Sequence, residues 1–414
     1  MSSNNWNEYL IEDISEVVFS GGTPSTQKEE YWGGEYNWLS SGETRNTFIT
    51  NTEKTITEAG VKNSSTKLAK KNDIVIASAG QGNTRGQVSL CKIDTFINQS
   101  IIAIRTNNKL VNPVYVFYNL KSRYKELRQI SDGHSIRGSL TTKIINKMKI
   151  NLPPIKDQNN IANILSSFDE KIEINNQISK KLEEMAQAIF KQWFVDFEFP
   201  NENGEPYKTS GGEMVESELG MIPKGWTITT LSKYGKLQMG LSPKSNTYNE
   251  EGIGIPLLNG AADFSGKLIT PNKYTTDPKR ICKENDLVFC IRATIGNITY
   301  ADKQYCLGRG VASITPLHET YSEYIYYNLK RKMDELISKA TGSVILGLSK
   351  PDINEMKMVV PNEGVLLNFH KIVSKFHKTT RNNDIQNLRL SNIRDTLLPK
   401  LMSGEIRVPV EEEK

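Results

Sequence analysis

The sequence repeats itself once, and this repeat limits the folds open to the chain more than any other feature. KKNDIVIASAG, from Lys70, matches KENDLVFCIRA, from Lys283. YVFYNLKSRYKELR, from Tyr115, matches YIYYNLKRKMDELI, from Tyr324, and INKMKINLPP matches INEMKMVVPN further on. Because the matches keep their order, the sequence predicts two structurally equivalent halves.

The spacing between matching positions divides each half into two parts. It falls from 220 residues at Trp6 and Trp226 to 209 at Tyr115 and Tyr324, and from Asn146 onward it stays at 208. Loops absorb insertions at little cost, whereas paired helices lose their pairing when one changes length. Each half therefore has a front part with loops of variable length and a back part of fixed length.

The front parts have an α+β pattern. Short β-rich runs such as DIVIAS and DLVFCI are separated by Gly, Asn and Pro. One helix is predicted in each front part, around Tyr115–Arg128 and Tyr324–Lys339.

The back parts are predicted to be long helices, one from Asp157 to near Trp193 and one from about Val365 until Pro399 disrupts it. Asn175-Asn176-Gln177 interrupts the apolar stripe of the first helix, and Asn382-Asn383-Asp384 interrupts the second at the same register. Both helices exceed the average of about 11–12 residues, and the first would be roughly 55 Å long. Equal length and matched breaks favour an antiparallel coiled coil over two helices that each pack on their own domain. The residues predicted for the coiled-coil or partner interface are Phe168, Leu182, Met185, Ile189, Phe376, Leu390, Ile393 and Leu397.

The predicted fold class is therefore α+β, with two mixed-β domains joined by a long antiparallel coiled coil. The predicted boundaries are 1–155 for the first domain, 156–198 for the central helix, 199–217 for a flexible surface linker, 218–362 for the second domain, 363–408 for the C-terminal helix and 409–414 for an acidic tail.

Composition is that of an ordinary globular protein, with 24% charged residues and a mean hydropathy of -0.47. No apolar run is long enough to span a membrane, and the N-terminus lacks the pattern of a secretion signal. The four cysteines form no CxxC pair, so reduced thiols in a cytoplasmic protein are expected. A net charge of +5 permits a polyanionic partner but does not require one.

The sequence contains no convincing catalytic set. Neither GxGxxG opening a helix nor GxxxxGK[ST] is present. His370 and His377 lie seven residues apart on one predicted helix, but no third metal ligand is evident. The stretch NLPPI, from Asn151, differs from the Asn-Pro-Pro-aromatic site of adenine methyltransferases by an extra Leu152 and a missing aromatic residue.

Loops rich in Gly, Arg, Lys and amide side chains recur at corresponding places in the two front parts. Glycine allows a backbone to approach a phosphate closely, and these polar side chains hydrogen-bond to base edges and to the DNA backbone. The DNA-contact candidates from this loop chemistry are Thr23, Gln81, Asn83, Arg85 and Arg137 in the first copy and Lys244, Asn259, Arg292 and Arg309 in the second.

Three stretches carry a resemblance to a known family. SELGMIPKGW, from Ser217, the helix exit FKQWFVDFEFP and the C-terminal LLPKLMSGEIRV resemble hallmarks of the specificity subunit of type I restriction-modification systems. The first copy departs from the pattern because it lacks the Leu-Gly-x-Ile-Pro lead-in that precedes Trp226.

The resemblance implies that each variable half is a target recognition domain for one half of a split, asymmetric DNA site. It also implies that the coiled coil sets the spacer and docks two modification (methyltransferase) subunits, with restriction subunits completing the complex. This chain would then be non-catalytic and bind no cofactor. S-adenosylmethionine, ATP and Mg would belong to the other subunits, which methylate adenine and cleave DNA.

Two other classes stay open at this point. One is a DNA-modifying enzyme with a degenerate catalytic centre in one half, which tight binding of S-adenosylmethionine would distinguish. The other is a coiled-coil scaffold with two ligand-binding domains and no role on DNA.

Overall fold

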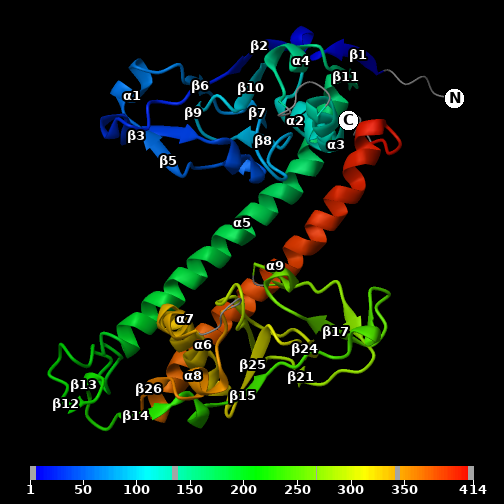
Figure 1. Ribbon diagram of the computed structural model, residues 1–414. Helices are drawn as coiled ribbons and strands as arrows, with labels where there is room; N and C mark the ends of the chain where they lie inside the picture. The colour runs from blue at the N-terminus through cyan, green and yellow to red at the C-terminus, as the bar shows by residue number, and fades with distance from the viewer. Residues whose placement is uncertain (1–5, 133–138, 267, 341–345, 409–414) are drawn as a thin grey trace, which may run out of the picture. The chain divides into compact units, whose positions relative to one another are not determined.

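The computed structural model describes residues 6–132, 139–266, 268–340 and 346–408. The chain divides into two compact units, residues 1–173 with 388–414, and residues 174–387. Each unit contains one domain of mixed sheets and short helices, together with part of each long helix, as Figure 1 shows. The predicted fold class, including the internal repeat, is confirmed.

Two sheets and one strand pair form the first domain. In the five-stranded sheet the order is β2 (Ser15–Ser20), β10 (Ile101–Thr106), β7 (Ile74–Ala77), β8 (Val88–Cys91), β4 (Phe48–Ile49). In the four-stranded sheet it is β5 (Lys54–Ile56), β3 (Trp32–Leu39), β9 (Thr95–Ile97), β6 (Lys67–Ala69), with β3 and β9 parallel. β1 (Asn7–Leu10) pairs antiparallel with β11 (Lys149–Leu152).

The second domain repeats this arrangement, with one strand fewer in the first sheet and one more in the second. Its four-stranded sheet has the order β15 (Gly235–Met239), β25 (Val311–Pro316), β22 (Leu287–Cys290), β23 (Ile298–Tyr300). The other sheet has the order β16 (Tyr248–Asn249), β20 (Tyr274–Thr275), β17 (Ile255–Leu258), β24 (Tyr305–Leu307), β21 (Ile281–Cys282), with β17 and β24 again parallel. β14 (Thr227–Thr230) pairs with β26 (Lys357–Val360), as β1 does with β11.

The equivalence extends to single turns. Asn72 and Asn285 both have positive φ, 72° and 67°. In each case the next residue is an aspartate whose Oδ2 accepts a hydrogen bond of 2.8 Å from a backbone N–H three residues earlier. Asparagine tolerates this left-handed conformation, so the same turn chemistry builds the same turn twice.

The helix predicted in each front part is two helices. In the first domain α2 (Pro113–Ser122) is followed by α3 (Tyr124–Asp132), and in the second α6 (Ser322–Arg331) is followed by α7 (Met333–Lys339). Arg123 lies at the first break, where its Nη1 donates to Lys149 O at 2.7 Å. Neither glycine nor proline marks this break in the sequence, so apolar periodicity predicts one continuous helix. Residues 58–62, 142–146 and 350–354 form the short helices α1, α4 and α8.

The two long helices are α5 (Ile155–Phe194) and α9 (Glu363–Ser403). The prediction that Pro399 ends the second helix is wrong, because α9 continues to Ser403. Proline removes one backbone hydrogen bond of the ladder, and the buried side chains of Leu398 and Leu401 hold this last stretch in the core of the first domain. The polar stretch at Asn175 likewise interrupts the apolar stripe but not the helix.

Side-chain contacts establish that the helices pair antiparallel. Within the second unit, Asn175 Nδ2 donates to Asn387 Oδ1 at 2.8 Å, whereas Ser179, later in α5, bonds Asn383, earlier in α9, at 3.2 Å. Apolar packing of Phe190 with Phe369 and Val373 continues the pairing in that unit. In the first unit, Asp169 forms an ion pair with Arg394.

Two of the predicted interface residues face solvent. Met185 and Ile393 are 50% and 46% exposed, while their neighbours Ala186 and Arg394 point inward. The other predicted residues are partly buried. At these two positions the predicted apolar stripe is one residue out of place. The inward positions are occupied by Ala186, which is small, and Arg394, which is charged, and a search for large apolar residues at helical spacing selects neither.

The segment predicted as a flexible linker has defined structure. Phe199 is buried, its ring stacking on Tyr207 and Trp226 with centroids 4.6 and 4.8 Å apart. β12 (Met214–Ser217) then pairs with β13 (Gly220–Pro223), so a hairpin spans the predicted boundary at 217. The linker prediction rested on the polar composition of the segment and did not take the packing of its aromatic residues into account.

Candidate nucleic-acid interface

Loops from four parts of the first domain meet at one place, which we call the first loop junction. Gly22 N donates to Ile97 O at 3.1 Å, and Asn98 N donates to Leu39 O at 3.1 Å. Ser78 N donates to Ser100 O at 2.8 Å. These bonds tie the ends of β2, β3, β7 and β9 together and fix the backbone of the loops that follow them.

The second domain has the same junction. Leu241 N donates to Leu307 O at 2.9 Å, Gly308 N to Leu258 O at 2.7 Å, and Ile291 N to Gly310 O at 2.9 Å. The close approach requires glycine, because a Cβ on Gly308 would lie 2.5 Å from Asn259 Oδ1 and 2.8 Å from Leu258 O. The sequence suggested these glycines as phosphate-approach positions; in the structure they permit packing of loop against loop.

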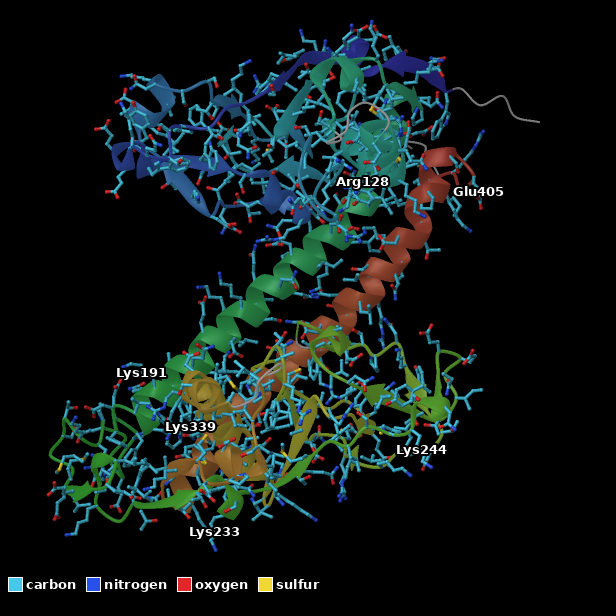
Figure 2. All side chains as sticks on the ribbon, viewed as in Figure 1. Arg128, Lys191, Lys233, Lys244, Lys339 and Glu405 are labelled. Carbon is cyan, nitrogen blue, oxygen red and sulfur yellow. The ribbon has the colours of Figure 1, made fainter. Side chains whose placement is uncertain are left out.

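All four candidates of the second domain lie on exposed loop positions that the second junction organises. Arg309 is held between Gly308 and Gly310, and its backbone N donates to Ser242 Oγ at 3.2 Å. Asn259 lies on the facing loop, and Arg292 follows the junction residue Ile291 and pairs with Gly347 in a β-bridge. Lys244 (Figure 2) lies further along the first of these loops.

The candidates of the first domain divide into two groups. Thr23 lies at the junction, where its hydroxyl donates to Gln99 Oε1. Gln81, Asn83 and Arg85 lie instead on the β7–β8 loop, and Arg85 forms an ion pair with Asp132. Arg137 lies outside the described residues.

Gln99 was missed by sequence reasoning. Gln99 is exposed and is equivalent to Arg309. Gln99 follows Asn98, whose N–H bonds the end of β3, and Arg309 follows Gly308, whose N–H bonds the end of β17. Alignment of INQS, from Ile97, with LGRG, from Leu307, was the available signal. The stretch INQS contains amide side chains but no glycine, so it does not stand out as a glycine-rich polar loop.

A hollow of about 450 Å³ opens beside the β7–β8 loop of the first domain. It is lined by Thr44, Arg45, Asn46, Thr47, Asn83, Gly86, Gln87, Val88, Lys121 and Tyr124. Helix α3 supports this loop: Tyr124 Oη donates to Asn83 O at 3.0 Å, and Arg128 Nη1 donates to Gly82 O at 2.9 Å.

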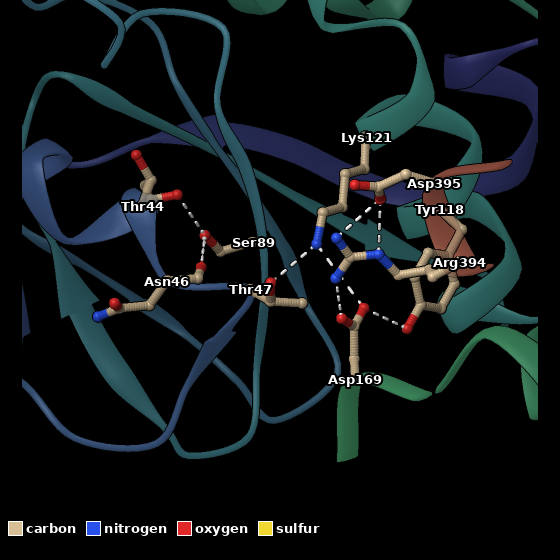
Figure 3. A network of polar contacts seen from close by, with 9 residues as sticks. All are labelled: Thr44, Asn46, Thr47, Ser89, Tyr118, Lys121, Asp169, Arg394 and Asp395. Atoms are coloured by element: carbon tan, nitrogen blue, oxygen red, sulfur yellow. Dashed lines mark hydrogen bonds and ion pairs between the residues drawn. The ribbon is translucent and has the colours of Figure 1, made fainter. Parts of the chain in front are cut away.

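A buried polar network joins this hollow to the long helices of the same unit (Figure 3). Lys121 Nζ donates to Thr47 Oγ1 at 2.8 Å and lies 3.7 Å from Asp169 Oδ2. Asp169 also accepts from Tyr118 Oη at 2.8 Å and pairs with Arg394. Burial lowers the pKa of Lys121 to about 8, although the Asp169 carboxylate opposes the shift.

The second domain has different chemistry at the equivalent place. Tyr327, the counterpart of Tyr118, lies 2.8 Å from His377 Nε2, and His377 is the counterpart of Asp169. Lys330, the counterpart of Lys121, pairs with Glu183 at 2.6 Å. His370 lies 2.7 Å from Glu323. Both histidines therefore help to attach the domain to the helices, and among the described residues no three His, Cys, Asp or Glu side chains are grouped as for a metal.

The cysteines are buried free thiols, and burial raises the pKa of Cys282 and Cys290 to about 12. Such thiols are unreactive at neutral pH. In the part of the chain that the structure describes, no helix is both long and apolar enough to cross a membrane.

Comparisons with known proteins agree on one family. Residues 3–184 and 223–394 match the model of the type I restriction modification DNA specificity domain. The chain is 28% identical to the type I restriction enzyme MjaIX specificity subunit of Methanocaldococcus jannaschii, over 97% of this chain and 94% of the relative. It is 26% identical to the HindI specificity subunit of Haemophilus influenzae, over 82% and 88%. The crystal structure of an S subunit from M. genitalium covers 97% of both chains with a TM-score of 0.62 at 19% identity, a likeness of fold.

Proposed function

The chain belongs to the family of type I restriction modification DNA specificity domains, and from this membership we propose that each recognition domain binds one half of a bipartite, asymmetric DNA site. As a specificity subunit it is the non-catalytic member of a restriction-modification complex. S-adenosylmethionine, ATP and Mg are proposed to bind the partner subunits, which carry the methylation and cleavage chemistry.

The observation that carries this proposal is that one loop junction occurs twice with different exposed side chains. Gln99 is exposed at the first junction, and Arg309 and Asn259 are exposed at the second. Arginine favours guanine, whereas glutamine and asparagine favour adenine in the major groove. Equivalent backbones with different side chains are suited to recognising two different half-sites. Because both domains lie in one chain, binding of the first domain to its half-site raises the effective concentration of the second domain at the other half-site.

Docking of two methyltransferase subunits is supported by exposed apolar residues on the long helices. Met185 and Ile393 lie 208 residues apart, at equivalent positions of the repeat, and both are large, apolar and exposed. Ile174 and Ile178 extend the exposed face on α5. A repeated apolar surface fits two copies of one partner. The fixed length of the helix pair is proposed to set the spacer between half-sites.

The test is to map methylated adenines in cells that express this chain with its methyltransferase subunits. Arg309→Ala is expected to relax recognition at one base pair of one half-site, a loss of about 1–3 kcal/mol of discrimination, and to leave the other half-site unchanged. Lys233→Ala, an exposed lysine of the same domain (Figure 2), is the control. Equal loss at both half-sites in the Arg309 variant would refute the assignment of one domain to one half-site.

A further inference from the structure

Resting on the proposed function, we propose that the hollow of the first recognition domain binds a phosphate of the DNA backbone, with Arg45 and Lys121 supplying the positive charge. This contact would strengthen binding to any sequence and would not select bases. The site is distinct from the loop junction because its lining residues come from the Thr44–Thr47 loop, the β7–β8 loop, α2 and α3.

The charge of the lining selects an anion. Two of the lining residues, Arg45 and Lys121, are basic, and none is a carboxylate. Asn46, Thr47 and Asn83 add side-chain amide and hydroxyl donors around them. Arg45 does pair with Glu53 at 2.7 Å, but both side chains are more than half exposed, so water screens this pair strongly. Arg45 therefore keeps most of its attraction for a second anion.

Lys121 is only partly neutralised by its neighbours. Its ion pair with Asp169 is long, at 3.7 Å, and the same carboxylate is shared with Arg394 and with Tyr118 (Figure 3). Its hydrogen bond goes to the neutral Thr47. An ammonium placed in this way still attracts a phosphate, and the low polarity around its stem strengthens that attraction.

The walls of the hollow are fixed before any ligand arrives. The Ser89 hydroxyl donates to Asn46 O at 2.6 Å and lies 3.0 Å from Thr44 O, which fixes one wall (Figure 3). Tyr124 and Arg128 hold the other wall through the carbonyl oxygens of Asn83 and Gly82. A site that needs no ordering loses little entropy on binding.

The second domain supplies a matched contrast. Lys330 occupies the position of Lys121 but pairs directly with Glu183, whose side chain is 14% exposed, at 2.6 Å. Its charge is therefore neutralised within the protein. The phosphate contact is inferred for the first domain alone.

The experiment measures DNA affinity of the methyltransferase complex against salt concentration, with a duplex carrying the methylated site and a scrambled duplex. The double variant Arg45→Gln with Lys121→Met should weaken binding to both duplexes by the same factor. The slope of the logarithm of the affinity against the logarithm of the salt concentration should fall in magnitude by about 1, the value for one phosphate contact. The methylated sequence should not change. Lys330→Met and the exposed Lys62→Gln are the matched controls, with an unchanged slope.

An unchanged slope in the folded double variant would overturn the inference. Arg45→Gln alone changes an exposed position and should still weaken binding to both duplexes equally. This single variant therefore tests the inference even if Lys121→Met impairs folding. In a second arm, ATP and inorganic phosphate are titrated in thermal-shift measurements. Stabilisation by ATP that the double variant abolishes, with an unchanged DNA slope, would identify a free nucleotide as the ligand instead. A wild-type complex that does not distinguish the two duplexes would refute the proposed function but not this contact.

Discussion

At the scale of residues, a few buried polar side chains attach each recognition domain to the long helices of its unit. Tyr118 and Tyr327 use the same hydroxyl at equivalent positions, but one meets a carboxylate and the other an imidazole. In the first unit, Tyr118, Lys121 and Arg394 all face Asp169.

Replacement of Asp169 by Asn should destabilise the protein by about 3 kcal/mol or more, because removal of one partner leaves a buried charge uncompensated. Asp169 is 3% exposed and Arg394 is 13% exposed at the side chain. Urea unfolding measures the change. The control is Glu170→Gln, since Glu170 is half exposed and pairs with Lys92 at 3.3 Å, so the cost should stay below about 1 kcal/mol. Equal costs for the two variants would contradict a structural role for the network.

The pKa of Lys121, lowered to about 8, predicts a pH dependence of stability. The unfolded lysine titrates near 10.4, so between pH 8 and that value the unfolded state binds more protons, and stability contributed by this group rises with pH. The charged groups around it are Asp169 of α5 and Arg394 and Asp395 of α9, with Tyr118 on its own helix. The free energy of unfolding of the wild type should therefore increase from pH 8 to 10 relative to Lys121→Met. If the free energies of unfolding of the wild type and of Lys121→Met changed in parallel with pH, the Lys121 ammonium would not be desolvated.

At the scale of elements, an asparagine cluster fixes the register of the two long helices in the second unit. Asn175 contacts Gln386 and Asn387. The contact between Asn383 and Ser179 is its equivalent in the repeat, because the spacing of 208 residues relates Asn175 to Asn383 and Ser179 to Asn387. A polar residue at a core position costs stability but specifies register, because other alignments leave its amide unpaired.

Asn175→Ala should cost about 1–3 kcal/mol, because it leaves polar groups of Gln386 and Asn387 without their partner. The midpoint of thermal unfolding measures the loss. Lys180→Ala, an exposed position on the same helix, should change the midpoint little. Stability unchanged by Asn175→Ala would mean that water replaces the lost contacts and that apolar packing alone sets the register.

At the scale of the whole molecule, the constant spacing of 208 residues in the helical parts contrasts with loop lengths that differ freely. Because paired helices cannot change length independently, the helix pair is the element of constant length in this chain. This is the property that a spacer-setting element needs.

A heptad inserted at facing positions, near Glu170 in α5 and near Asn392 in α9, keeps the stripe in phase. It adds roughly 10 Å of helix, so the spacer between the methylated half-sites should lengthen by about three base pairs at 3.4 Å each. Mapping of methylated adenines measures the spacer. Insertion into α5 alone should instead abolish methylation. A longer helix pair with an unchanged spacer would contradict the proposed role.

The plan of the molecule, two equivalent mixed-β domains and two long paired helices, can be predicted from the amino-acid sequence. These follow from the repeat and from apolar periodicity, which are local or internal properties of the chain. The continuation of α9 past Pro399 was not predictable, because packing of Leu398 and Leu401 in the core outweighs the local effect of proline. The breaks at Arg123 and Lys332 were missed because neither glycine nor proline marks them in the sequence.

The grouping of residues into sites became visible in the three-dimensional structure. Gln99 became a candidate when its loop was found at the same junction as that of Arg309, and the hollow around Lys121 joins loops and helices that lie up to 80 residues apart. Met185 and Ile393 changed from helix-pairing residues to exposed positions in the same way. The physical reason is that a side chain's burial and partners depend on which segments pack beside it, and periodicity along one segment does not contain that information.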